Sequence, residues 1–310
     1  MLFELFREIF NRKMMKKITL FSLFILLAVL VSAQSARRQE PPQRLQAETN
    51  VLSYNIRLDL ASDSVNRWDN RKERVVQTIL DNEADIVGLQ EVIHHQLVYI
   101  AESLPNYDWM GVGRGDGMEK GEYSPIFYNK NKFTEVGSGY FWLSETPMEA
   151  GSKGWDAALP RIATWAKLQD NRTKRTVFVL NTHFDHMGQQ ARTESARLIL
   201  EKINAYTKKE LFPVIVTGDF NATPESDVIK SITDVRNPFH LIDTRFISPK
   251  KLGVDWSFHN FGRLEMNKRP LLDYVFVQNN VSVLEYEVID DTGGNGYTSD
   301  HCPVLVKVLF

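Results

Sequence analysis

Only one cysteine, Cys302, occurs among the 310 residues, so the chain forms no intramolecular disulfide. No cysteine follows the N-terminal apolar segment, which excludes a lipid-linked cysteine there. Such a chain depends on its core for stability, and a hydrophobic content of 43% is enough for a sizeable core. Internal repeats are also missing and Pro and Gly are scattered, which excludes a solenoid and argues against disorder.

The sequence also lacks an excess of basic residues, since its net charge is −2. Residues 1–33 hold five basic and two acidic side chains, which leaves −5 for the remainder. Proteins that bind long nucleic acids are usually basic over the contact surface. The charge therefore favours a small or local phosphate substrate. No Gly-x-Ser-x-Gly turn exposes a nucleophilic serine, and no cluster of three histidines favours zinc.

The N-terminal segment has the pattern of a secretory signal peptide. Two lysines precede an apolar run over residues 18–31, and the small residues Val31-Ser32-Ala33 complete a cleavage pattern. The run is short for a membrane span, so residues 1–33 are predicted to be a signal, with an uncleaved anchor as the alternative. Two methionines stand directly before the lysines, and residues 1–13 are interpreted as an over-extended start.

The remainder is expected to be one exported domain. Residues 34–48 are polar and are predicted to form a flexible lead, and residues 49–310 are predicted to form the domain. A disulfide-free exported chain fits a bacterial periplasm or exterior. We expect a monomer with no stable membrane span once the signal is removed.

Short apolar strands and amphipathic helices follow one another along this domain. Strands are expected at residues 50–60, 85–92, 125–128, 139–143, 162–169, 176–182, 271–277, 283–288 and 303–309 and at the start of 214–223, and helices at 71–83, 94–104, 189–208 and 225–233. Several strands are joined without a helix, which favours mixed or antiparallel sheets covered by helices. The Gly-rich residues 111–121 are predicted to form a mobile loop, and Tyr140-Phe141-Trp142 a half-buried strand.

The stretch at 214–223 starts with four β-branched residues, the composition of a buried strand. It ends in Gly218, Asp219 and Asn221. Because side chains alternate along a strand, Asp219 and Asn221 point the same way and could hold a water and a phosphate oxygen together. Taken alone, the stretch is equally typical of a strand that ends in a polar turn.

Other polar residues also lie in or beside apolar strands. The set comprises Asn55, Glu91, His183, Asp185, Asp219, Asn221, Asp273, Asp300 and His301. An ionisable group in such a strand is costly, and active sites gather at strand ends, so the set predicts an active site. Glu91 and Asp300 could hold a hard cation such as Mg²⁺, and Asp219 could act as the base toward water. His183 and His301 could donate protons or hydrogen bonds to phosphoryl oxygens.

Six motifs carry a resemblance to a known superfamily: Ser53-Tyr54-Asn55, Gly88-Leu89-Gln90-Glu91-Val92, Asn181-Thr182-His183, Gly218-Asp219-Phe220-Asn221, Leu272-Asp273-Tyr274 and Ser299-Asp300-His301-Cys302-Pro303. Over about residues 50–310 the chain resembles the endonuclease/exonuclease/phosphatase superfamily, which has the deoxyribonuclease-I-like fold. This superfamily includes deoxyribonucleases, abasic-site endonucleases, neutral sphingomyelinases, inositol-polyphosphate 5-phosphatases and deadenylases. The resemblance implies an α+β fold, a four-layer α/β/β/α sandwich of two mixed β-sheets with outer helices.

The resemblance also implies roles for individual residues. Glu91 would be the principal ligand of Mg²⁺, or of Mn²⁺ in its place, with Asp300 near the metal. Asn55 would support the metal site and a phosphate oxygen. Asp219 would orient or deprotonate the attacking water while Asn221 holds the phosphate. His301, oriented by Asp273, would stabilise the transition state or protonate the leaving group. His183 would share these roles.

Some positions depart from the superfamily pattern. Arg57 stands where many relatives carry an acidic residue, and Glu122 begins the tripeptide that stands where several nucleases place a phosphate-binding arginine. Arg161 could supply that missing cation, so Arg57 and Arg161 are candidate phosphate contacts. The segment over residues 160–166 is most similar to bacterial members near the deadenylase branch.

A few further polar residues stand beside these motifs. Asp185 and His186 could be site or turn residues, and the remaining histidines are interpreted as helix-cap or surface residues, with His259 near the rim.

These residues together predict an exported Mg²⁺-dependent phosphoesterase that hydrolyses a phosphodiester or a phosphomonoester. The alternatives are a nuclease acting on DNA or RNA, a sphingomyelinase-like lipid phosphodiesterase, and a non-catalytic binding protein with the same fold. The substrate depends on loops at residues 111–121 and 244–270, whose conformations the sequence does not give.

Overall fold

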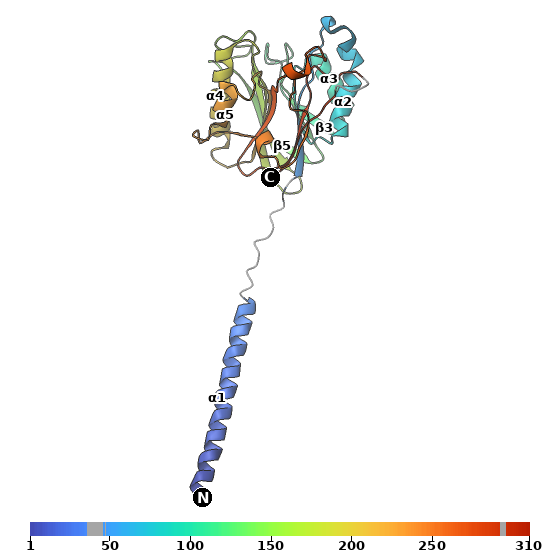
Figure 1. Cartoon of the computed structure of the whole chain (residues 1–310). Helices are drawn as coiled ribbons and strands as arrows, with labels where there is room; N and C mark the ends of the chain where they lie inside the picture. The colour runs from blue at the N-terminus through green and yellow to red at the C-terminus, as the bar shows by residue number, and fades with distance from the viewer. Residues whose placement is uncertain (36–45, 47, 292–295) are drawn as a thin grey trace. The chain divides into compact units, whose positions relative to one another are not determined.

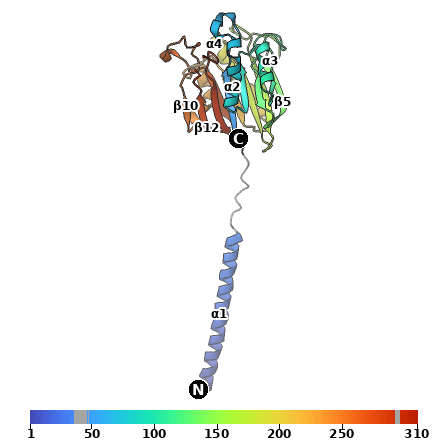
Figure 2. The ribbon, with the colours of Figure 1, turned by 90° about the vertical axis from the view of Figure 1, so that its right-hand side faces the viewer.

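The computed structural model describes residues 1–35, 46, 48–291 and 296–310. The chain divides into two units, residues 1–45 and residues 46–310. Two β-sheets form the centre of the second unit (Figures 1 and 2).

The seven-stranded sheet has the order β10 (Lys251–Gly253), β12 (Ser282–Val288), β13 (Val304–Leu309), β1 (Glu48–Asn55), β2 (Ile86–Gln90), β4 (Ile126–Asn129) and β3 (Tyr107–Met110). The six-stranded sheet has the order β5 (Phe133–Trp142), β6 (Ile162–Asp170), β7 (Thr176–His183), β8 (Val214–Asp219), β11 (Asp273–Gln278) and β9 (Ile242–Asp243). The pairs β1–β2, β10–β12 and β7–β8 are parallel and the other pairs are antiparallel, so both sheets are mixed.

Helices cover the outer faces of both sheets (Figure 1). Helices α2 (Lys72–Asp81) and α3 (His94–Ser103) lie over the seven-stranded sheet, and α4 (Gln189–Thr207) and α5 (Asp227–Thr233) lie over the six-stranded sheet. The short elements are α6 (Thr244–Ile247), η1 (Ala61–Asn66), η2 (Trp68–Asn70) and η3 (Met266–Lys268). The predicted four-layer sandwich is confirmed.

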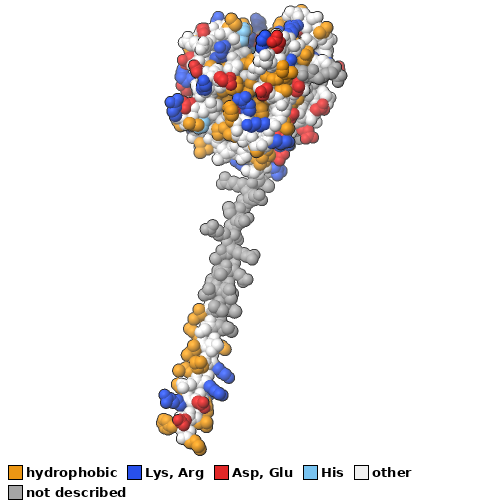
Figure 3. Space-filling model, in the orientation of Figure 1, with side chains coloured by type: hydrophobic (Ala, Val, Ile, Leu, Met, Phe, Trp, Pro, Cys, Tyr) orange, Lys and Arg blue, Asp and Glu red, His pale blue; other side chains and the backbone are white. Residues whose placement is uncertain are grey.

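The first unit contains one long helix, α1 (Leu2–Ser35), which covers the predicted signal segment. Its described side chains include exposed apolar and basic residues (Figure 3). Among the residues that the structure describes, no helix combines the length and the apolar character needed to cross a bilayer. Most of the predicted flexible lead at residues 34–48 lies outside the described residues.

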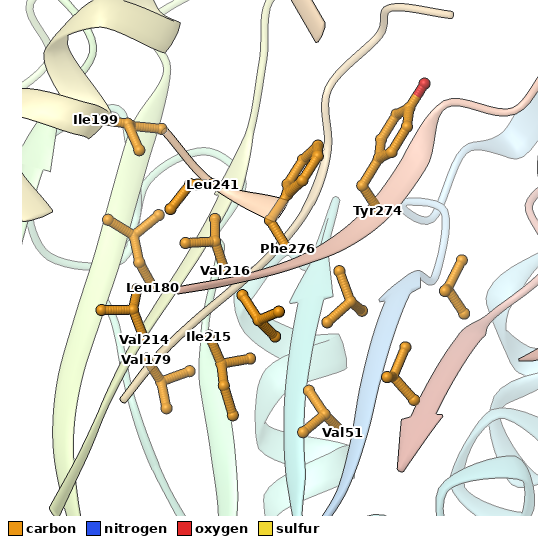
Figure 4. Close-up of a cluster of buried hydrophobic side chains, with 14 of the residues drawn as sticks. Val51, Val179, Leu180, Ile199, Val214, Ile215, Val216, Leu241, Tyr274 and Phe276 are labelled. Atoms are coloured by element: carbon orange, nitrogen blue, oxygen red, sulfur yellow. The ribbon is translucent and has the colours of Figure 1, made fainter. Parts of the chain in front are cut away.

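Strand β8 is buried along its whole length, which explains why its apolar residues form a run and do not alternate. Its side chains pack with those of β7, β11, β1 and helix α4 in one cluster (Figure 4). Burying each valine or isoleucine contributes roughly 1.5–3 kcal/mol, so this cluster fixes the strand that ends in Asp219.

A small polar cluster joins the two sheets beside the end of β8. The Asn181 Nδ2 group donates to Leu89 O at 2.7 Å and to Pro125 O at 2.9 Å, and Asn181 Oδ1 accepts from Gln90 Nε2 at 2.7 Å. Thr217 Oγ1 also donates to Asn181 Oδ1, at 3.0 Å. Asn181 uses its amide hydrogens and its oxygen on partners from both sheets, while Gln90 Oε1 has no partner among the described residues. Bonds from one buried side chain to both sheets hold them at one separation, so Asn181 sets the spacing of the sheets near the predicted site.

Several elements differ from the sequence-based expectation. Strand β5 begins at Phe133, six residues before the predicted strand, and β3, β9, β10 and α6 were not predicted. The Gly-rich residues 111–121 form a turn with internal hydrogen bonds, such as Gly115 N to Lys120 O at 2.8 Å. In β5, Tyr140 is exposed while Phe141 and Trp142 are buried, so the interpretation as a half-buried strand is confirmed.

Gly88 provides a test of the close sheet contact. A Cβ at this position would lie 2.1 Å from Thr217 Oγ1 and 2.6 Å from Asn181 Oδ1. We expect Gly88→Ala to lower the free energy of unfolding by about 1–3 kcal/mol or more, because the polar cluster would have to move. Urea unfolding measures the loss.

The matched control is Gly137→Ala in β5, where among the described residues no heavy atom beyond Gly137 and its two chain neighbours lies within 4 Å of the added Cβ. The free energy of unfolding of this variant should stay close to that of the unchanged protein. Equal effects of the two substitutions would contradict the inferred sheet contact at Gly88.

Candidate active site

The predicted site residues gather around one cavity of about 520 Å³. Eight of them line it: Arg57, Glu91, Arg161, His183, Asp219, Asn221, Asp300 and His301. Asn55 and Asp273 are fully buried and bond to residues in the lining. The structure therefore brings together the ten residues to which the sequence analysis assigned catalytic, metal or phosphate roles.

Strand register places three of these residues in a row. His183, the last residue of β7, pairs with Asp219, the last residue of β8, and Asp219 pairs with Asp273, the first residue of β11. In the other sheet, Asn55 at the end of β1 pairs with Gln90, directly before Glu91. Each sheet thus contributes one side of the cavity.

Asp219 is the carboxylate with the most contacts to other predicted site residues. Its Oδ1 accepts from Asn221 N at 2.9 Å, and its Oδ2 accepts from Asn55 Nδ2 at 3.0 Å. The Nε2 atoms of His183 and His301 lie 3.5 Å and 3.8 Å from Oδ2. Burial, together with the charge of Asp273, raises the pKa of Asp219 to about 7, which suits a base that works near neutral pH.

His301 is held by a buried carboxylate. Its Nδ1 lies 2.8 Å from Asp273 Oδ2, which also accepts from Ser257 Oγ at 2.6 Å. Ser257 Oγ accepts from the backbone N–H groups of Leu272 and Asp273, so its own hydrogen points to the carboxylate. Burial lowers the pKa of His301, but the charge and hydrogen bond of Asp273 outweigh it and raise that pKa to about 10. An imidazolium with Nε2–H toward the cavity follows.

His183 has a defined proton arrangement as well. Asn221 Nδ2 donates to Phe184 O at 3.0 Å and lies 3.1 Å from His183 Nε2, so that nitrogen accepts and Nδ1 carries the proton. The buried Nδ1 has no hydrogen-bond partner among the described residues, and Glu122 Oε2 lies 3.7 Å away. Burial and the charges of Arg161 and Arg114 lower the pKa of His183, which keeps the ring neutral.

Glu122 is a site residue that the sequence reasoning did not select. It lines the cavity and forms an ion pair with the buried Arg114. Burial raises the pKa of Glu122. A sequence signal was present, since Glu122 follows the Gly-rich turn and precedes β4, the neighbour of β2.

Arg161 is positioned by Asp185. Its Nε donates to Asp185 Oδ2 at 3.2 Å and its Nη2 lies 3.0 Å from His186 Nδ1, while the buried Nη1 has no partner among the described residues. Asp185 accepts four backbone N–H groups, and these bonds and Arg161 outweigh burial and lower its pKa. Asp185 therefore orients Arg161 in the wall of the cavity.

Asn55 links the two sides of the cavity. Its Oδ1 accepts from Arg57 N at 3.0 Å, so its Nδ2 faces Glu91 Oε1 at 3.1 Å as well as Asp219. Arg57, Glu91 and Asn221 all have left-handed backbones, with φ of 57°, 61° and 47°. Non-glycine residues held in this conformation cluster at functional sites, where the surrounding structure maintains the strain.

The donor set fits a hard divalent cation. The carboxylates of Glu91 and Asp219 each offer one oxygen, and these atoms and a nitrogen of His183 all lie within 4.8 Å of one another. His183 Nε2 already accepts from Asn221, so the two carboxylates are the ligands that the site offers. Burial also raises the pKa of Asp300, so the cavity holds carboxylates whose charge a cation would stabilise. The predicted partner ligands, Glu91 and Asp300, are both approached by Arg57 Nη1, at 3.8 Å and 3.6 Å.

The placement of His259 near the rim is wrong. His259 is fully buried, and its ring packs against the ring of Tyr297, with 5.1 Å between the two ring centroids. Its Nδ1 accepts from Gly262 N at 3.1 Å, so its proton lies on Nε2 and faces Asp291 Oδ1 at 3.6 Å. With Nε2 protonated, the nearby Asp291 and Cys302 do not complete a metal site.

Comparison with known proteins gives a consistent result. The model of the Endonuclease/Exonuclease/phosphatase family matches residues 52–301. An endonuclease/exonuclease/phosphatase structure from Bacteroides vulgatus is 42% identical, with a TM-score of 0.81 over 84% of this chain and 98% of that chain. A mannosyl-6-phosphatase from Bacteroides thetaiotaomicron is 36% identical, with a TM-score of 0.77 over 84% of this chain and all of that chain (100%).

Similarity extends to the deadenylase-like branch that the sequence pattern indicated. Human Nocturnin is 23% identical over 271 residues, which cover 79% of this chain and 59% of that protein. The Ccr4 exoribonuclease subunit of Saccharomyces cerevisiae is 22% identical over 295 residues, covering 78% of this chain and 35% of that protein. The chain thus spans little more than half of Nocturnin and about a third of Ccr4.

The raised pKa of Asp219 leads to a test of its environment. Between pH values near 4 and 7 the native state keeps a proton that the unfolded chain releases, so this group's contribution to stability falls as pH rises. Asparagine has no such proton. We therefore compare the free energies of unfolding of Asp219→Asn and the unchanged protein in EDTA. The value for the variant minus the value for the unchanged protein should increase as the pH is raised over this interval, by at most about 1.4 kcal/mol per pH unit.

Urea unfolding near pH 5 and near pH 8 measures this difference. Asp255→Asn, at an exposed carboxylate, is the control and should show no comparable rise. A pH-independent difference between Asp219→Asn and the unchanged protein would contradict a raised pKa at Asp219.

Proposed function

Since the chain belongs to the endonuclease/exonuclease/phosphatase family, we propose that it is an exported Mg²⁺-dependent phosphoesterase in which Asp219 activates the attacking water. One observation carries the proposal. A buried Asp219 accepts a hydrogen bond from Asn55 and faces the Nε2 atoms of His183 and His301 within 3.8 Å. Members of the family are phosphoester hydrolases, which supports the same reaction class.

The residues of the cavity divide the work of the reaction. Glu91, with His183 and Asp219 close by, would hold the cation, which when bound polarises the phosphoryl oxygens. Asp219 takes the proton of the attacking water at its carboxylate. His301, held as an imidazolium by Asp273, donates from Nε2 to a phosphoryl oxygen or to the leaving oxygen.

Binding and orientation of the phosphate fall to the other cavity residues. The guanidinium of Arg161 would bind a phosphoryl oxygen, since it lines the cavity, is fixed by Asp185 and has at Nη1 a nitrogen without a partner among the described residues. Asn221 keeps His183 in place through a contact of its Nδ2. Asn55 Nδ2 donates to both Glu91 and Asp219 and so holds the two carboxylates beside each other. Positioning of this kind accounts for much of the catalysis of phosphoryl transfer.

The substrate we favour is a phosphomonoester of a sugar. The similar Bacteroides thetaiotaomicron protein is named a mannosyl-6-phosphatase. Beside the charged groups, the cavity has apolar lining from Leu58, Leu159, Phe258 and Leu272, which can contact the carbon face of a ring. Basic and acidic side chains are interspersed on the face of residues 46–310 seen in Figure 3, unlike a basic nucleic-acid track.

A nuclease is the second candidate. The similarity to Ccr4, named a 3'-5'-exoribonuclease subunit, supports it. A sphingomyelinase-like enzyme has less support, because only Tyr140 of the aromatic run is exposed. A non-catalytic role has no support in the cavity, because eight of the predicted residues line it and Asn55 and Asp273 bond to that lining. Export is supported by the N-terminal sequence pattern and the disulfide-free composition, and the monomeric state is part of the proposal.

The test is release of inorganic phosphate or of product from a panel of hexose phosphates, inositol phosphates, RNA, DNA and sphingomyelin, with Mg²⁺ and with EDTA. We expect hexose phosphates to be hydrolysed with Mg²⁺ only. Asp219→Ala and His301→Ala should each lower turnover by at least about 10²-fold. Asp234→Ala, which removes an ion pair with the exposed Arg236, is the control and should keep full activity.

Different outcomes separate the candidates. Cleavage of RNA or DNA, with binding that weakens steeply as salt rises, would favour the nuclease over the sugar phosphatase. Full activity in both alanine variants would contradict the proposed mechanism for every substrate.

A further inference from the structure

Arg57 is held beside the carboxylates of the cavity by a fork of hydrogen bonds. Its Nε and Nη2 donate to the two oxygens of Asp63 at 3.0 Å and 3.2 Å. The remaining nitrogen, Nη1, lies 3.8 Å from Glu91 Oε2 and 3.6 Å from Asp300 Oδ2. These distances exceed those of good hydrogen bonds but lie in the range of ion pairs. Nη1 of Arg57 therefore interacts electrostatically with the carboxylates of both Glu91 and Asp300.

The backbone of Arg57 is fixed as firmly as its side chain. Its φ of 57° is left-handed, and its N–H donates to Asn55 Oδ1 at 3.0 Å. Its carbonyl accepts from Arg71 Nη2 at 2.6 Å and from Gln96 Nε2 at 3.0 Å. A residue bound at both ends keeps its charge in one place.

The location makes this charge effective. Asp300 is buried, the side chain of Glu91 is 13% exposed and that of Arg57 is 25% exposed, so solvent and salt screen their interaction less than at the surface. A cation bound at Glu91 meets the repulsion of this fixed positive charge. The same charge neutralises the second carboxylate that the sequence pattern had assigned to the metal.

We propose that Arg57 is a built-in counter-ion of Glu91 and Asp300, which weakens divalent-cation binding and takes the place of a second cation. The inference rests on the proposed function, because it assumes that Glu91 binds the metal. Arg57 then has a role beyond the phosphate contact expected from the sequence: it sets the metal affinity of the resting site.

The test is Mn²⁺ binding to the full chain without substrate, measured by titration calorimetry. Arg57→Gln should bind Mn²⁺ roughly ten-fold more tightly than the unchanged protein, because a positive charge near the ligands is removed. The double variant Arg57→Gln/Asp63→Asn replaces the ion pair with two neutral groups. It should show the same gain in Mn²⁺ affinity, which excludes an effect of the Asp63 charge left without Arg57.

The matched control is Arg67→Gln. Arg67 also forms a forked pair with an aspartate, Asp59, at 3.3 Å, and no contact places it on Glu91 or Asp300. Its Mn²⁺ affinity should stay unchanged. Unchanged or weaker Mn²⁺ binding in both Arg57 variants would overturn the counter-ion role while leaving the proposed function intact. Absence of Mn²⁺ binding by every protein, the unchanged one included, would instead contradict the metal-dependent function itself.

Discussion

The hydrogen bond from Asn55 to Asp219 crosses between the two sheets at the point where the proposed reaction takes place. Glu91 and Asn55 come from the seven-stranded sheet, whereas His183, Asp219 and Asp273 come from the six-stranded sheet. Neither sheet alone contains both the cation ligand and the base. The chemistry therefore depends on the spacing of the sheets, which the buried cluster around Asn181 fixes only a few residues away.

The cavity brings together groups that are unfavourable to bury. Carboxylates at Asp219, Glu122 and Asp300 have raised pKa values because water is excluded around them. Arginines and imidazoles offset part of this charge, as Arg57 does beside Glu91 and Asp300. A site of this kind lowers the stability of the resting protein in return for ionised groups at fixed positions, a trade-off common in enzymes. Binding of a cation and a phosphate would relieve the imbalance.

Much of the fold and the cavity could be predicted from the sequence, because polar residues at the ends of apolar strands, such as Asp219 and Glu91, are visible in a linear pattern. Two residues that support the site from outside these strand ends, Ser257 and Asp63, have no such signal. Ser257 and Asp63 act through contacts with Asp273 and Arg57 that only the folded chain creates. The burial of His259 also depends on how its loop folds.

A crystal structure with Mn²⁺ and inorganic phosphate tests the central claim most directly, since anomalous scattering locates the ion without reference to activity. The account predicts an ion bound by Glu91, with the phosphate on Arg161 Nη1 and facing both Asp219 and His301 Nε2. An ion and a phosphate bound outside this cavity, or an ion bound without Glu91, would contradict the claim that the two sheets assemble a phosphate-cleaving centre around Asp219.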